Sequence, residues 1–222
     1  FEQFTSQLFQ EEMTGSTLNM HYTIADPKTF GISEYEPVLP IYHSDQPEDS
    51  KEHCSDLLHR LDRIDPDRLS PENAYTYRLL HRSLENDLAL ADFPYYNEPL
   101  SPSSGMQSQL PVLLAEYTFR TKRDVTDYLA LLDQIDDYFA SLLLYRQRYE
   151  QEKAAAGFFM PACSSEKVRK QCDTIVTTEE LAQGTHFLQT TFEDRLSELQ
   201  KQGLFTPEET ASLIETNDRL LA

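Results

Sequence analysis

The feature that most constrains the fold is a long run of apolar residues at helical spacing. Between Thr121 and Ala156, apolar side chains recur at alternating steps of three and four residues, which is the period of an α-helix. Thr121 is suited to cap the start of this helix, and Gly157 is suited to end it in the left-handed conformation. The pattern therefore predicts one long helix over 121–156. Further apolar residues widen its stripe, so we expect it to contact several neighbours. The positions that carry the period are Val125, Tyr128, Leu132, Ile135, Phe139, Leu142 and Tyr149.

Similar patterns predict shorter helices elsewhere in the chain. Ser70 and Pro71 form a helix start, and that helix is expected to run until Phe93-Pro94. Capping boxes at Thr177 and Thr206 predict two more starts. The predicted ranges are the first 13 or so residues, about 48–64, about 71–92, about 178–202, and 207 onward.

Glycine and proline indicate the remaining architecture. Only 6 of 222 residues are glycine, whereas nucleotide-binding α/β folds and tight β-hairpins consume glycine in their turns. Two proline-rich stretches, 26–47 and 94–106, predict long ordered loops. The predicted fold is all-α: a single irregular multi-helix domain over 1–222, with one long central helix and two long proline-rich loops.

Charge and cysteine content exclude several classes of protein. Asp and Glu number 38 against 19 Lys and Arg, so the net charge of −19 opposes nucleic-acid binding. No apolar run is long enough to predict a membrane span. Cys54, Cys163 and Cys172 form no C-x-x-C pair, which argues against a zinc site or a disulfide framework. A Cys163–Cys172 disulfide stays open as an alternative, although idle thiols are favoured.

The sequence contains no recognisable catalytic or metal-binding motif. No histidine begins the H-E-x-x-H pattern of many zinc hydrolases. On a helix, Cys54 and His59 would point about 140° apart, so one metal ion does not easily collect them. His81 and Glu85 lie one helical turn apart, and we interpret them as a surface pair rather than as metal ligands. We therefore predict no catalytic residue, metal ligand or cofactor within this chain.

Five short segments together carry a family resemblance. They are LNMHYTIADP at 18–27, YYNEPLSP at 95–102, GMQSQLP at 105–111, DVTDYL at 124–129 and GFFMP at 157–161. In this order they resemble the bacterial domain of unknown function 885 family, whose members are helical, often lipoproteins, and similar to gluzincin-type zinc metallopeptidases. The resemblance implies the N-terminal half of a gluzincin-like fold. The zinc, the H-E-x-x-H helix and the third ligand would belong to a C-terminal part outside this sequence, and the whole protein would be extracytoplasmic and lipid-anchored.

The resemblance also implies a role for this chain. We expect an N-terminal scaffold that is inactive alone and forms one wall of a peptide-binding cleft, with the catalytic part of the same protein as its partner. The candidate segment is 94–111, where Tyr95 and Tyr96 would pack on a peptide and Gln107 and Gln109 would hydrogen-bond its backbone. The competing interpretation is that these four residues only fix the loop against the helices.

A different class of function is a non-catalytic helical interaction module. The last predicted helix stays apolar up to Ala222 without a stop signal, so we expect it to be cut within the helix and to present an apolar face to a partner. The residues of that face are Leu213, Ile214, Leu220 and Leu221.

Overall fold

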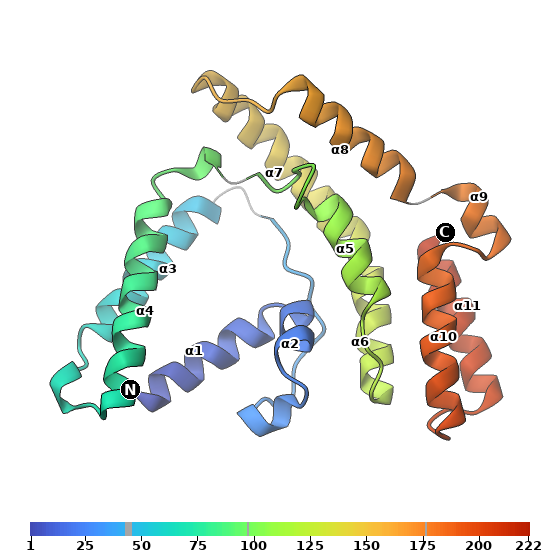
Figure 1. The fold of residues 1–222 in the computed structure, drawn as a ribbon, viewed down its shortest axis with the longest axis horizontal. Coiled ribbons are helices and arrows are strands. Elements are labelled where there is room, and N and C mark those ends of the chain that lie inside the picture. The colour runs from blue at the N-terminus through green and yellow to red at the C-terminus, as the bar shows by residue number, and fades with distance from the viewer. Residues whose placement is uncertain (43–45, 97, 176) are drawn as a thin grey trace.

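The computed structural model describes residues 1–42, 46–96, 98–175 and 177–222, and within these ranges it contains helices and no strand. The all-α prediction is therefore confirmed. Figure 1 shows the helices, which are α1 (Glu2–Thr14), α2 (Thr17–Thr23), α3 (Gln46–Leu61), α4 (Pro71–Leu90), α5 (Met106–Ala115), α6 (Lys122–Asp133), α7 (Ile135–Ala155), α8 (Ala162–Ile175), α9 (Thr178–Gln183), α10 (Phe187–Lys201) and α11 (Pro207–Leu221). Short 3₁₀ helices are η1 (Pro27–Phe30), η2 (Pro66–Arg68) and η3 (Pro94–Tyr96).

The predicted long central helix is two helices, so that prediction was wrong in its continuity. Helix α6 ends at Asp133 and α7 begins at Ile135, with Gln134 at the junction. The Gln134 amide donates to the carbonyl of Pro37 at 3.0 Å and accepts the N–H of Leu39 at 2.9 Å. The break thus lies where one side chain satisfies the backbone of a distant extended segment. The end of the pattern is as expected, because Gly157 adopts the left-handed conformation with a φ of 86°.

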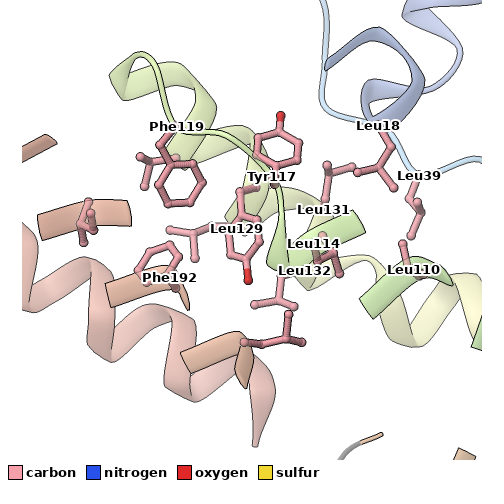
Figure 2. Close-up of a cluster of buried hydrophobic side chains, with 14 of the residues drawn as sticks. Leu18, Leu39, Leu110, Leu114, Tyr117, Phe119, Leu129, Leu131, Leu132 and Phe192 are labelled. Carbon is pink, nitrogen blue, oxygen red and sulfur yellow. The ribbon is translucent and has the colours of Figure 1, made fainter. Parts of the chain in front are cut away.

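Apolar side chains form three separate clusters. The main cluster joins α5, α6 and α7 to α10 and α11, and Tyr128, Leu142 and Phe192 are fully buried in it. Figure 2 shows part of this cluster. A second, small cluster contains Met20, Ile24 and Ile32, and a third joins α3 and α4 to α1. In Figure 1 the α3–α4 pair and the α10–α11 pair stand at opposite sides, with α5 to α7 between them.

The C-terminal half deviates from prediction around α9 in two respects. The expected helix over 178–202 is divided into α9 and α10, because Gly184 ends α9 at a φ of 67° and His186 caps α10 through its ring. The capping box expected at Thr177 is not formed. The Thr177 side chain accepts no backbone N–H of α9, and its hydroxyl donates to the Glu180 carboxylate. The box at Thr206 is formed as predicted.

The predicted apolar face of α11 is partly covered within the chain. Its four residues are partly buried and pack against the main cluster. Helices α10 and α6 contact α11, so the face is not wholly open, and whether a partner binds the remainder stays a prediction. The three cysteines are free thiols, as favoured from sequence. Among the described residues no helix is both long and apolar enough to cross a bilayer.

Candidate functional site

Tyr95 and Tyr96 lie on η3 within a group of aromatic rings. Ring centroids of Tyr95 and Tyr96 lie 6.1 Å and 5.6 Å from that of Phe158, and Tyr96 also contacts Phe93 at 6.2 Å. We call these four residues the aromatic patch. Its outermost member, Tyr96, is 73% exposed, and the adjoining Phe159 is 72% exposed. The patch thus presents apolar surface to solvent, as a binding surface for a peptide requires.

Glu98 ties this segment to α7. Its carboxylate accepts hydrogen bonds from Arg146 Nη1 and from Lys153 Nζ, each at 2.5 Å. The side chains of Arg146 and Lys153 are only 14% and 6% exposed. These charge-assisted hydrogen bonds connect the segment that follows η3 to α7.

The structure separates the two predicted glutamines. Gln107 is 3% exposed, and its Nε2 donates to the carbonyl of Ser101 at 2.8 Å and to Gln171 Oε1 at 2.9 Å. Gln171 in turn donates to the carbonyl of Pro102 at 2.9 Å. Gln107 therefore holds the turn that follows η3 against α8. The side chain of Gln109 is exposed and stays accessible to a ligand.

A cavity of roughly 550 Å³ lies where two of the segments with family resemblance meet. His21 comes from the first of them and Asp124 from the fourth. The His21 ring stacks on Tyr117 with centroids 3.6 Å apart, and its Nε2 accepts the N–H of Thr118 at 3.1 Å. Its Nδ1 lies 3.8 Å from Asp124 Oδ1. We call this space the His21 cavity.

Burial controls the ionisation of the groups around this cavity. Desolvation lowers the pKa of His21 to about 4, so the ring is neutral near pH 7. Because Nε2 accepts a hydrogen bond, the ring proton lies on Nδ1, toward Asp124. Burial likewise raises the pKa of Asp127, whose Oδ2 accepts a 2.6 Å hydrogen bond from the Tyr35 hydroxyl. Arg123 lies against both partners, with Nε 3.4 Å from Asp127 Oδ1.

Sequence reasoning did not select these residues as a site. His21 and Asp124 were visible only as parts of resembling segments, and nothing in the sequence indicated that the two segments meet. The signal that was available is the combination of His21 with Asp26 in one segment and Asp124 with Asp127 in another. The sequence does not identify such residues as a site, because it does not show that the fold brings them together.

A second space is an apolar groove of roughly 530 Å³ at the end of α11. Side chains of α5, α6, α7 and α8 line it together with Leu220 and Leu221. The Oε1 atom of Gln107, a residue of this lining, is buried without a hydrogen-bond partner. The groove is thus mainly apolar with few polar groups.

Metal-binding geometry is absent from the described part of the chain, which contains no group of three or more His, Cys, Asp or Glu residues able to hold an ion. His81 does meet Glu85 as expected, with Nδ1 3.5 Å from Oε2. Its Nε2 lies 3.0 Å from Asp62. Since the two ring nitrogens face different carboxylates, the arrangement is a surface cluster of polar contacts.

Comparisons with known proteins agree with this architecture. A structure described as "the putative lipoprotein from Colwellia psychrerythraea" matches with a TM-score of 0.73 at 14% sequence identity. The match covers 99% of this chain and 37% of that protein, so the chain spans little more than a third of its solved neighbour. No curated protein matches at a significant level. The model of the family described as "Bacterial protein of unknown function (DUF885)" matches residues 28–219. Because that match covers most of the sequence, the chain belongs to the DUF885 family.

Proposed function

We propose that this chain is the N-terminal helical scaffold of a longer, zinc-dependent metallopeptidase-like hydrolase. In this proposal residues 1–222 form one helical domain, half of a gluzincin-like fold, and the whole protein is extracytoplasmic and lipid-anchored. The size of the Colwellia protein supports the first part, because its fold continues well beyond the region that this chain matches. The described residues do not fit a zinc site. The metal and its ligands would therefore come from polypeptide outside this chain, and we assign no chemical step to the residues here.

The role of this chain would be to form one wall of the substrate cleft. The observation that carries this proposal is the exposed aromatic patch on a segment held in place by Glu98. Tyr96 offers an apolar ring face to a peptide side chain, and Gln109 offers an amide to its backbone. Gln107 would act indirectly, because its amide nitrogen is occupied by Ser101 and Gln171. Tyr95 would anchor the segment on α7 through its ring contact with Tyr149.

The experiment compares the 222-residue chain with the product of the complete gene. Zinc content by mass spectrometry should be near zero for the chain and stoichiometric for the complete protein, and only the latter should hydrolyse a peptide library. In the complete protein, Tyr96→Ala should raise KM several-fold, whereas Tyr75→Ala, which removes another exposed ring from α4, should not. Chelator-sensitive hydrolysis by the chain alone would refute the scaffold proposal. Equal KM values for the two variants would refute the substrate wall.

A non-catalytic interaction module is the second candidate function. Leu143 and Leu144 of α7 are 56% and 70% exposed, and such adjacent apolar side chains favour a protein partner. This candidate predicts a complete gene product without zinc that still forms a stable complex with another protein. The zinc measurement above therefore separates the two candidates.

A further inference from the structure

The His21 cavity has an apolar wall and a charged rim. Met20, Ile24 and Ile32 line it and belong to the second apolar cluster. Pro27 and Lys28 of η1 and the residues that open α6 complete its lining. A space of roughly 550 Å³ whose lining combines apolar and polar side chains has the dimensions of a small-molecule site.

Three basic residues line this cavity beside two carboxylates, although acidic residues outnumber basic ones two to one in the chain, 38 against 19. Lys28, Arg120 and Arg123 all line it. Arg123 is engaged by Asp127 and by the carbonyl of Tyr35. Within the described parts of the chain, no ion pair joins the side chain of Lys28 or of Arg120 to a carboxylate, whereas Arg123 pairs with Asp127. Two cations at the rim are thus available to a ligand.

The two acidic residues of the lining are occupied by the backbone. Asp26 Oδ1 accepts the N–H of Lys28 at 3.1 Å and caps η1. Asp124 Oδ2 accepts the N–H groups of Arg120 and Thr121 at 2.9 Å and 2.7 Å, and its Oδ1 faces His21. Because these carboxylates stabilise turns, they position the cations at the rim without forming direct ion pairs with them.

Tyr117 adds a neutral donor. Its side chain is 1% exposed and lines the cavity, and Figure 2 shows its hydroxyl pointing away from Leu129 and Leu132. Burial raises the pKa of Tyr117 far above its ordinary value, so the hydroxyl keeps its proton. Within the described residues this hydroxyl makes no hydrogen bond. The stacked ring of His21 holds it in place.

We propose that the His21 cavity binds a small organic anion. Its carboxylate or phosphate group would be held by Arg120 and Lys28 with a hydrogen bond from Tyr117, and its apolar part would contact Met20, Ile24 and Ile32. This inference does not depend on the proposed hydrolase function.

The test is calorimetric titration of the 222-residue chain at constant ionic strength with four probes. Phenyl phosphate and phenylacetate present the two anionic groups on the same apolar body, and their relative affinities distinguish a phosphate from a carboxylate ligand. Inorganic phosphate lacks the apolar body, and phenethylammonium carries the opposite charge. We expect saturable binding of at least one aromatic anion, weaker binding of inorganic phosphate, and no binding of phenethylammonium.

Substitutions locate the binding. Arg120→Gln should lower the affinity for the tighter-binding aromatic anion by about tenfold or more, because a charge-assisted hydrogen bond is lost. Tyr117→Phe should weaken it several-fold. The matched control, Arg78→Gln on the exposed face of α4, removes the same charge far from the cavity and should change the affinity by less than about twofold. Circular dichroism checks that each variant is folded, and Arg120 is exposed, so its loss should not disturb the core.

Three results would overturn the proposal. The first is the absence of saturable binding for both aromatic anions at millimolar concentration. The second is equal affinity for phenethylammonium. The third is an equal effect of Arg120→Gln and Arg78→Gln, which would indicate a general charge effect rather than a site.

Discussion

Gly105 allows a sharp test of how the segment after η3 is held. Its φ and ψ of −75° and 150° are open to any residue, so backbone conformation does not require glycine here. Space does require it. A Cβ at this position would lie 2.1 Å from Gln107 Oε1 and 2.5 Å from both the nitrogen and the oxygen of Ser101. Two of these three atoms are backbone, so the turn itself must shift.

We expect Gly105→Ala to lower the free energy of unfolding by about 2–4 kcal/mol. Overpacking of a tight site costs roughly 1–3 kcal/mol, and the displaced turn also loses the hydrogen bond between Gln107 and Ser101, worth about 1 kcal/mol. Gly105→Asn should cost more than Gly105→Ala, because the larger side chain meets the same backbone atoms. Urea unfolding followed by circular dichroism measures both values.

Gly184 is the matched control, because backbone conformation rather than lack of space favours glycine at this position. Its φ is 67°, and nothing lies within 4 Å of an added Cβ. Gly184→Ala should cost about 1–2 kcal/mol through backbone strain, and Gly184→Asn should cost less, since asparagine tolerates the left-handed region. At Gly105 the asparagine variant should therefore be less stable than the alanine variant, and at Gly184 it should be more stable. A Gly105→Ala protein within about 0.5 kcal/mol of the wild type would refute the steric argument.

Two further predictions concern charge. The pKa of His21 is lowered from 6.5 to about 4, so between these values the unfolded chain binds more protons and stability rises with pH. From pH 7 to pH 4, the wild type should lose about 3 kcal/mol more than His21→Gln in urea unfolding, and parallel losses would contradict the assignment. Glu98→Gln removes one of the two carboxylates that pair with the shielded Arg146 and Lys153, while Glu150 stays, and should cost about 1–3 kcal/mol. Glu166→Gln, which breaks an exposed pair with Lys170, should cost less than about 0.5 kcal/mol, and similar losses in both variants would show that the Glu98 network is not shielded.

Local signals in the sequence predicted the helix starts well. The caps at Ser70 and Thr206 act through neighbouring residues, so their effect can be read directly from the chain. The break at Gln134 could not be predicted, because its cause is a hydrogen bond to Pro37 and Leu39, far away in sequence. Helix α5 was missed for another reason: Pro111 lies inside it, and proline ordinarily argues against a helix interior.

The candidate site shows the same division between local and long-range causes. Tyr96 is exposed on a proline-rich segment that the sequence predicts as a loop, whereas the buried Gln107 is hydrogen-bonded to Gln171 of α8, which is distant in sequence. The His21 cavity requires residues 21 and 124 to lie close together, and hydrophobic periodicity does not predict such a long-range contact. The assignment of Tyr95, Tyr96, Gln107 and Gln109 to a substrate cleft stays a prediction.

The division of the apolar interior into three clusters has a mechanical consequence. Helices α3 and α4 share their own small cluster with α1, and Leu61 is its most deeply buried member. Loss of contacts there does not require opening of the region around Phe192, so the two ends of the molecule can lose amide-exchange protection independently. The His21 cavity is built on the smallest cluster, between these two ends. A ligand bound there would contact Tyr117 of the main cluster together with Met20, Ile24 and Ile32 of the second cluster, and would therefore link the opening of these two clusters.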